Sequence, residues 1–372
     1  MKLFEKINVG GLELKNRIMF PPMVTRRGDF ENFVTEDCKK FYVNLAKGGV
    51  GSLVIEMTSV SKTLPLLLGL YTDEHTAGFK EMTDEIHSSS DAKIFIQLGD
   101  SLPPLLNVEE IPLEMIDYFC HNLTAASVRA KDAGFDGIEL HGAHGYILSS
   151  FLSLRNKRKD EYGKNSEGRI KLTKKVLKGV KDACGKEFPV GIRINGDDFI
   201  VGGNTLKQTK IIAKELVKEG IAYLSISAGA KMQDAWHPEE NQSLYPYPKP
   251  GPWTGSAGYS GHRCVPPHYM PDGVNVYLAE EIRKEIAGYN VPVITAGKIP
   301  DPEFAESVLT ERRADIVGIC RPILCDFNWP VKAETGRADK IVKCVYCNKC
   351  MEAPRLMRPT ACIQGKNKKE KE

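Results

Sequence analysis

Four cysteines near the end of the chain have a spacing suited to a metal centre. Cys344, Cys347 and Cys350 form a C-x2-C-x2-C run, and Cys362 follows after a short excursion. Three thiolates from one turn with a distant fourth are typical of iron–sulfur ligation. Structural zinc sites more often pair two C-x2-C arms. We therefore predict a [4Fe–4S] cluster in residues 341–365, with zinc or free thiols as the alternatives.

Two histidines and a tyrosine form a second candidate site. His141, His144 and Tyr146 stand at positions i, i+3 and i+5, directly after an apolar run. A lone histidine is most often structural, but two imidazoles and a phenol this close together can donate hydrogen bonds and move a proton. We expect them on the reactive face of the fold.

The elements that must position these residues recur along the chain as short apolar runs separated by helix-like stretches. The helical spacing of apolar residues is clear in 114–133 and 168–183. Near-continuous apolar strands alternating with helices predict parallel βαβ units. The eight predicted strands are 17–22, 52–57, 93–98, 137–141, 189–194, 223–227, 291–296 and 316–320.

Eight such units predict an α/β protein of the (β/α)8 TIM-barrel class, in which the loops after the strands build the active site. We expect the barrel in residues 1–340, the iron–sulfur segment in 341–365 and a solvated tail in 366–372. The loop 232–275 is long and rich in Pro, Gly, Tyr and His. Loops of this length are usually functional or disordered, so we expect a lid that faces the substrate.

Composition narrows the possible functions. The 372-residue chain is 42% hydrophobic and 27% charged, with a net charge of +3, which gives no reason to expect nucleic acid as a partner. No apolar run approaches a membrane span, and the first residues lack the core of a signal peptide. We expect a cytoplasmic protein. No GxGxxG motif occurs, so no Rossmann domain is predicted.

Three motifs together resemble the old yellow enzyme superfamily. They are LELKNRIMFPPM at 12–23, HGAHGYILSSFLSLRNKRKDEYGKNSEGR at 141–169 and VGICRP at 317–322, followed by the cysteine run. The resemblance extends from residue 3 to about residue 362. It is to the iron–sulfur branch, which contains 2,4-dienoyl-CoA reductase, trimethylamine dehydrogenase and 2-enoate reductase, and it implies an FMN-containing barrel.

The resemblance assigns the cofactor contacts. Arg193 matches the arginine at the flavin N1/O2 edge, where a cation stabilises the reduced ring, and Gln97 matches the glutamine that bonds the pyrimidine ring. The loops after the seventh and eighth strands are the usual phosphate site. The expected FMN-binding residues are Met23, Val24, Thr25, Glu56, Gln97, Arg193, Gly297, Lys298, Gly318 and Arg321. Either Val24 or Thr25 is expected to face the ring.

The resemblance also assigns the catalytic roles. His141 and His144 match the pair that bonds a substrate carbonyl, and Tyr146 matches the residue that protonates the α-carbon. Trp236-His237 resembles a Trp-His pair in the dienoyl-CoA reductase, where the histidine assists the tyrosine. The amine dehydrogenase has a tyrosine in place of His141, which argues against amine oxidation.

One departure affects the substrate. Relatives show QLxHxGR after the third strand, whereas residues 97–101 here read Gln-Leu-Gly-Asp-Ser. The pocket is therefore altered, and no relative's substrate can be copied.

The predicted function is reduction of the C=C bond of an α,β-unsaturated carbonyl compound, such as an enoate, an enoyl-thioester or an enone. Electrons are expected from an electron-donor protein or partner subunit, or from NAD(P)H. The alternatives are an amine or other dehydrogenase that exports electrons through the cluster, and an electron-transfer subunit of a larger complex. A homo-oligomer is compatible with the sequence.

Overall fold

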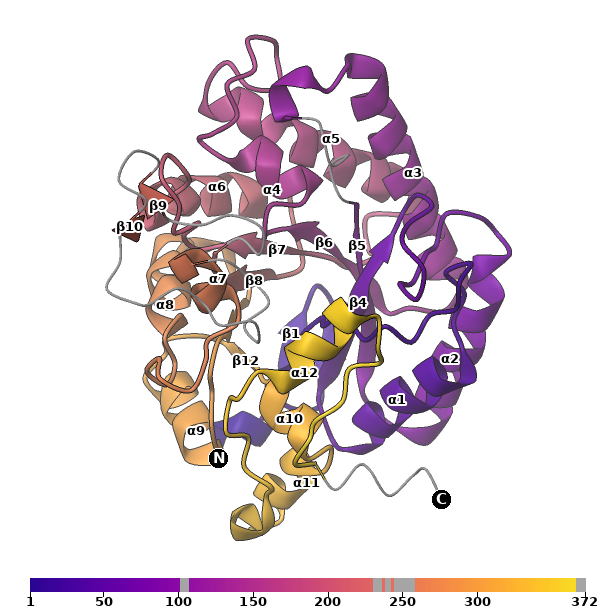
Figure 1. Cartoon of the computed structure of the whole chain (residues 1–372), viewed down its shortest axis with the longest axis vertical. Helices are drawn as coiled ribbons and strands as arrows, with labels where there is room; N and C mark the ends of the chain where they lie inside the picture. Colours follow the sequence, from indigo (N-terminus) through magenta and orange to yellow (C-terminus); the bar gives the residue numbers. More distant parts are fainter. Residues whose placement is uncertain (101–106, 230–235, 238–241, 244–257, 366–372) are drawn as a thin grey trace.

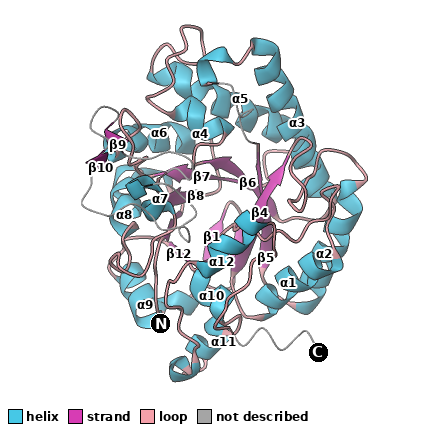
Figure 2. Cartoon of the chain, in the orientation of Figure 1, coloured by secondary structure: helices cyan, strands magenta, loops and turns pink. Residues whose placement is uncertain are grey.

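The computed structural model describes residues 1–100, 107–229, 236–237, 242–243 and 258–365. Its centre is a closed barrel of parallel strands with helices around it (Figures 1 and 2). The strand order is β11-β12-β3-β4-β5-β6-β7-β8. The barrel strands are β3 (Ile18–Phe20), β4 (Ser52–Ser59), β5 (Lys93–Gly99), β6 (Gly137–Gly142), β7 (Val190–Asn195), β8 (Leu224–Ser227), β11 (Val293–Ala296) and β12 (Ile316–Gly318).

The eight predicted strands are all present, and the TIM-barrel class is confirmed. Every residue of β4, β6 and β7 is buried, because helices cover the outer face of the sheet and side chains fill the interior. The register aligns Gln97 with Glu139, His141 with Arg193, and Arg193 with Ser225. Polar side chains from four neighbouring strands are thereby aligned across the barrel.

Several helices begin at a residue whose side chain caps the first turn. Thr35 accepts a hydrogen bond from the Cys38 N–H at the start of α1, and Asp301 accepts one from the Phe304 N–H at the start of α9. The α-helices are α1 (Glu36–Lys47), α2 (His75–Ser89), α3 (Leu113–Asp132), α4 (Ile147–Leu152), α5 (Ser166–Cys184), α6 (Leu206–Lys218), α7 (Gly258–Cys264), α8 (Val276–Glu285), α9 (Pro302–Thr310), α10 (Arg321–Cys325), α11 (Trp329–Glu334) and α12 (Lys349–Glu352). The 3-10 helices are η1 (Lys2–Phe4), η2 (Val108–Glu110), η3 (Ala287–Tyr289), η4 (Ala338–Lys340) and η5 (Ala353–Leu356).

A hairpin that was not predicted closes the amino-terminal end of the barrel. Strands β1 (Ile7–Val9) and β2 (Leu12–Leu14) pair antiparallel across a Gly-Gly turn, and both glycines have positive φ. Val9 and Leu14 belong to a buried cluster with side chains from the barrel strands. This apolar plug leaves the opposite, carboxyl-terminal end for a site.

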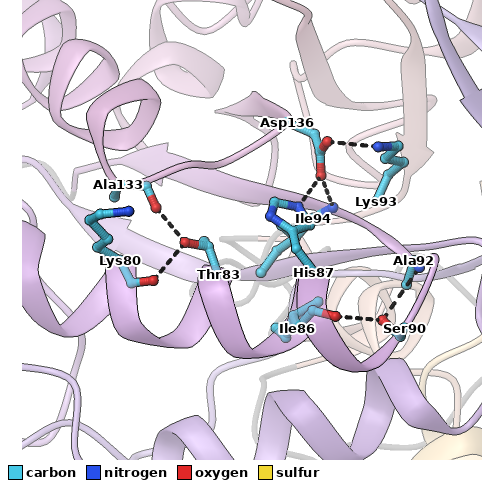
Figure 3. A network of polar contacts seen from close by, with 10 residues as sticks. All are labelled: Lys80, Thr83, Ile86, His87, Ser90, Ala92, Lys93, Ile94, Ala133 and Asp136. Carbon is cyan, nitrogen blue, oxygen red and sulfur yellow. Dashed lines mark hydrogen bonds and ion pairs between the residues drawn. The ribbon is translucent and has the colours of Figure 1, made fainter.

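Asp136 joins several elements at the amino-terminal end. Its carboxylate accepts hydrogen bonds from Lys93 Nζ at 3.1 Å and from the Ile94 N–H at 2.8 Å. It also pairs with His87 Nε2 at 2.9 Å (Figure 3). The residue therefore fastens the end of α2 and the start of β5 to the turn before β6.

Two short strands, β9 (Trp236–His237) and β10 (Gln242–Ser243), pair with each other in the expected lid loop. Residues 258–275 of that loop are described and include α7; most of the remainder lies outside the described residues. Within the described part of the chain, no helix has both the length and the apolar character needed to span a membrane.

Candidate active site at the carboxyl end of the barrel

A cavity with about 920 Å³ of empty space, its mouth included, opens at the carboxyl-terminal ends of the strands. This is the end at which TIM barrels carry their active sites. Eleven of the predicted site residues line it: Met23, Val24, Gln97, His141, His144, Tyr146, Arg193, Gly297, Lys298, Gly318 and Arg321.

The two histidines and the tyrosine contact one another on the cavity wall. The His141 and Tyr146 ring centroids are 4.4 Å apart, and those of His141 and His144 are 5.2 Å apart. His141 is buried at the end of β6, while Tyr146 directly precedes α4. The backbone of His144 has φ +61°, a conformation that turns the chain sharply between the two elements. His141, His144 and Tyr146, which are close in sequence, thus form a single cluster of hydrogen-bond donors.

Arg193 brings a buried cation to the same cavity. Its Nη2 donates to Ser227 Oγ at 3.3 Å. Its Nε and Nη1 are buried and have no hydrogen-bond partner among the described residues. Leaving two guanidinium donors unpaired in the interior is costly. The arrangement therefore fits a bound molecule that presents acceptor atoms to this edge of the cavity.

Gln97 is held by a buried acid. Gln97 Nε2 donates to Glu139 Oε1 at 2.8 Å. Burial raises the pKa of Glu139, and the charge of Arg193 opposes that rise. Because Glu139 engages the amide nitrogen, the side-chain orientation of Gln97 is fixed, and the residue can present its amide oxygen to a ligand.

Thr25 and Glu56 lie behind the cavity wall rather than on it. The Thr25 N–H donates to Glu56 Oε2 at 2.9 Å, and the Thr25 hydroxyl bonds Oε1 of the same carboxyl. The Tyr42 hydroxyl accepts a hydrogen bond from the Glu56 N–H at 3.0 Å. Burial raises the pKa of Glu56 to about 7. Of the two residues expected to compete for the ring, Val24 lines the cavity and Thr25 is anchored away from it.

The loops after β11 and β12 bring backbone N–H groups and the guanidinium of Arg321 to the cavity wall. Gly297 has φ +125°, and a Cβ there would lie 2.8 Å from Asn275 Nδ2, so only glycine permits this close approach. The Lys298 ammonium donates to the carbonyl oxygens of His268 and Met270 and lies 3.3 Å from Asp272. The Lys298 donors are therefore engaged by their own surroundings. Arg321, the first residue of α10, lines the same part of the cavity, and its Nη1 donates to the Pro266 carbonyl and to Asn348 Oδ1.

The cysteine segment, residues 341–365, crosses the same end of the molecule, where α12 lies in front of the barrel in Figure 1. Thr360 donates from its hydroxyl to the Val24 carbonyl at 2.9 Å and from its N–H to the Thr25 carbonyl at 2.8 Å. Arg321 donates to Asn348 Oδ1 at 2.5 Å. These bonds connect the segment to both predicted cofactor regions.

The four cysteines are close enough to interact. Cys344 interacts electrostatically with Cys347 and Cys362, and Cys350 interacts with Cys344 and Cys362. Burial raises the pKa of Cys344 and raises that of Cys350 to about 12, while the charge of Arg321 lowers both. Among the described residues, no group of three or more His, Cys, Asp or Glu side chains is arranged to hold a single metal ion. The iron–sulfur assignment therefore stays a prediction.

Several cavity residues were not expected from the sequence. Tyr346 and Met351 come from the cysteine segment, and Cys264 comes from the end of α7. The Tyr346 ring lies 4.7 Å from the Arg321 guanidinium and 5.3 Å from the Lys298 ammonium. Only the position of Tyr346 and Met351 between the cysteines pointed towards a site. The side chain of His237, predicted to be catalytic, lies outside the described residues.

The model of the NADH:flavin oxidoreductase / NADH oxidase family matches residues 2–110, 100–245 and 257–340. The chain belongs to this family. Membership confirms the resemblance to the old yellow enzymes and makes the chain a flavin oxidoreductase by class.

Named relatives agree with that assignment. The NADH oxidase of Thermoanaerobacter brockii is 35% identical over 93% of this chain and 52% of its own length. The cinnamate reductase of Clostridium sporogenes is 30% identical over 94% of this chain and 55% of its own length. The chain thus spans about half the length of these relatives.

Solved structures share the fold. A 2-naphthoyl-CoA reductase in complex with 2-naphthoyl-CoA has a TM-score of 0.83 at 23% identity, over 98% of this chain and 57% of that chain. Histamine dehydrogenase from Rhizobium sp. 4-9 has a TM-score of 0.80 at 23% identity, over 98% of this chain and 52% of that chain. At this identity the likeness concerns the fold alone.

Proposed function

We propose that the chain is an FMN- and [4Fe–4S]-dependent oxidoreductase that reduces the C=C bond of an α,β-unsaturated carbonyl compound: an enoate, an enoyl-thioester or an enone. The observation that carries the proposal is the convergence of His141, His144, Tyr146 and Arg193 on one cavity. The cinnamate reductase relative supports the substrate class, because cinnamate is an α,β-unsaturated carboxylate.

The residues present fit FMN. The unpaired Nε and Nη1 of Arg193 are donors for the acceptor edge of the flavin ring, and Gln97 offers its amide to the pyrimidine part. The Gly297 and Gly318 loops, together with Arg321, suit the phosphate. When bound, FMN supplies the hydride that an alkene reduction requires.

The chain's own residues account for the rest of the chemistry. His141 and His144 hold the substrate carbonyl oxygen and donate hydrogen bonds as this oxygen gains negative charge. Tyr146 donates the proton to the α-carbon. Tyr146 is half-buried on the cavity wall, so its hydroxyl is available to a ligand there.

The cysteine segment supports an iron–sulfur cluster by its donor set. Four soft thiols lie in this segment, and the charge of Arg321 partly opposes the effect of burial, which raises the pKa of Cys344 and Cys350. Cys344, Cys347, Cys350 and Cys362 would hold the cluster through their four thiolates. Its chemistry is one-electron transfer, which suits an electron-donor protein or partner subunit; NAD(P)H is the other candidate donor.

The test begins with protein purified without oxygen. We expect a flavin absorbance spectrum together with iron and acid-labile sulfide. Cinnamate, an enoyl-thioester and a cyclic enone are then added to the photoreduced protein, and at least one of them is expected to reoxidise the flavin rapidly. Tyr146→Phe should slow that reaction, whereas Tyr71→Phe, at a tyrosine that does not line the cavity, should not.

Two outcomes would overturn the proposal. A protein that neither contains nor takes up flavin would remove its basis. A flavin that is inert towards every activated alkene but is bleached by an amine would favour the dehydrogenase alternative.

A further inference from the structure

Ser227 connects Arg193 to His144. Its hydroxyl oxygen accepts from Arg193 Nη2 at 3.3 Å and lies 2.6 Å from His144 Nε2. Ser227 is the last residue of β8 and is 4% exposed. Neither its residue type nor its position in the sequence marked it as part of the site.

The direction of this chain of hydrogen bonds follows from the available protons. Arginine can only donate, so the Ser227 oxygen is the acceptor in the first bond. The serine has one proton, and among the described residues the ring nitrogen His144 Nε2, 2.6 Å from the hydroxyl oxygen, is placed to receive it. A buried hydroxyl that left this acceptor unused would forfeit a hydrogen bond. Ser227 therefore donates to His144.

A histidine that accepts at Nε2 is neutral and carries its proton on Nδ1. A doubly protonated His144 would require Ser227 to accept from two cations. It would also place a second positive charge one hydroxyl away from Arg193, which is unfavourable in a buried site.

The backbone of His144 is fixed as well. Its N–H donates to Asn195 Oδ1 at 3.3 Å, and Asn195 Nδ2 donates to Asp198 Oδ1 at 2.8 Å. The neighbouring imidazole has the opposite pattern, because the Ala143 N–H donates to His141 Nδ1 at 3.4 Å. A neutral His141 therefore has its proton on Nε2. Each ring thus keeps one defined N–H donor.

We propose that Ser227 is a positioning residue that holds His144 as the neutral Nδ1–H tautomer. Its hydroxyl accepts a hydrogen bond from Arg193 and donates its own proton to His144 Nε2. The tautomer follows from the hydrogen bonds alone. Its use, donation from Nδ1–H to the carbonyl oxygen of an unsaturated substrate, rests on the proposed function. The same contact ties the substrate-binding imidazole to the cation expected at the flavin edge.

The tautomer can be measured directly. In protein labelled with ¹⁵N-histidine, long-range ¹H–¹⁵N spectra distinguish protonated from unprotonated ring nitrogens, and His144→Gln identifies the His144 signals among the eight histidines. We expect Nε2 of His144 to be unprotonated in the wild type. Ser227→Ala should shift the ring towards Nε2–H, and Ser227→Thr, which keeps the hydroxyl, should preserve the wild-type pattern. Ser88→Ala, at an exposed serine of α2 whose hydroxyl donates to the Glu85 carbonyl, is the control and should change nothing.

Kinetics then test the role of the tautomer. With the enone or enoate that reoxidises the flavin, Ser227→Ala should lower kcat/KM by roughly 10- to 100-fold, because the donor is misoriented, and Ser227→Thr should recover most of it. A protonated Nε2 in the wild type, or an unchanged pattern in Ser227→Ala, would refute the inference even if alkenes are reduced. A confirmed tautomer in a protein inert to all alkenes would refute the proposed substrate-binding role.

Discussion

Glu56 is a carboxyl group buried directly behind the residues that follow β3. Its two oxygens bond the backbone and hydroxyl of Thr25, and its backbone N–H donates to Tyr42. The sequence predicted a contact between Glu56 and the flavin. In the structure, Glu56 lies behind the cavity wall and holds the 23–25 loop in place through its bonds to Thr25. Because burial is the largest cause of its raised pKa, its protonation state affects stability.

We expect stability to fall as pH rises through the Glu56 titration. The native carboxyl keeps its proton to about pH 7, whereas the unfolded one loses it near 4.5. Unfolding therefore releases a proton between these values, which lowers the free energy of unfolding by about 3 kcal/mol across the window. Urea denaturation from pH 5 to 8 measures this. Glu56→Gln mimics the protonated acid and should flatten that part of the profile; an equally steep profile in the variant would assign the effect to other groups.

Many of the predicted residues that line the cavity belong to contiguous motifs. His141, His144 and Tyr146 follow one strand, and the loops around Gly297 and Gly318 follow two others. Ser227 and Tyr346 were missed because their roles depend on packing between distant parts of the chain. A serine ending a strand and a tyrosine between cysteines carry no signal until the barrel register and the path of the cysteine segment are known.

Among the elements, the network around Asp136 belongs to the amino-terminal end of the barrel. At that end of a TIM barrel, side-chain networks are expected to serve stability rather than catalysis. Burial disfavours ionisation of Asp136, but hydrogen bonds from His87 and the Ile94 N–H, with the charge of Lys93, lower its pKa overall. The carboxylate thus remains charged while it joins α2, β5 and β6.

Asp136→Ala should destabilise the fold without disturbing the site. We expect a loss of about 1–3 kcal/mol in the free energy of unfolding, because the Ile94 N–H and the His87 and Lys93 side chains lose their shared acceptor. FMN affinity, measured by flavin fluorescence, should stay unchanged. Asp182→Ala removes an exposed ion pair with Lys178 and should cost at most about 0.5 kcal/mol. Equal losses in the two variants would contradict this account.

Thr360 fastens the cysteine segment to the barrel and is fully buried. Thr360→Val removes the hydroxyl donor to the Val24 carbonyl and should cost about 1 kcal/mol. The loss should be local, so hydrogen–deuterium exchange should accelerate in 341–365 and not in the barrel strands. Thr310→Val removes an exposed hydroxyl bond to the Glu306 carbonyl and serves as the control. Uniformly faster exchange would mean that the segment and the barrel unfold as one unit.

The β1–β2 hairpin was absent from the predicted elements although its signal is present. Two short runs with apolar residues, INV and LEL, flank Gly10-Gly11, and paired glycines favour the turn of a two-residue hairpin. The runs are three residues each, too short for periodicity to separate a strand from a loop. The barrel strands were found because the apolar runs that contain them are five or six residues long and are separated by helix-like stretches.

At the scale of the whole molecule, the cavity unites distant parts of the chain, from Met23 after β3 to Met351 in α12. A ligand that fills it contacts both the barrel and the cysteine segment. Binding to the native state alone should therefore stabilise the entire fold.

FMN should stabilise flavin-free protein more than riboflavin does. At a free concentration of about 100 times its Kd, FMN adds about 2.7 kcal/mol. Each kcal/mol raises Tm by about 1 °C, because the entropy of unfolding grows with the 372 residues of the chain. Riboflavin lacks the phosphate that Arg321 is expected to bind, so at the same concentration its effect should be clearly smaller. Calorimetry of the apoprotein with each ligand measures the difference. Equal shifts would argue against the assigned phosphate loops.

The position of Tyr346 and Met351 has a consequence for how the protein can be shortened. Since both side chains form part of the cavity surface, a chain cut after residue 340 would lose more than its thiols. Water would reach the part of the cavity that Tyr346 and Met351 now cover, and Arg321 would lose its contact with Asn348. Deleting the cysteine segment should therefore not yield a simpler protein with the same cavity.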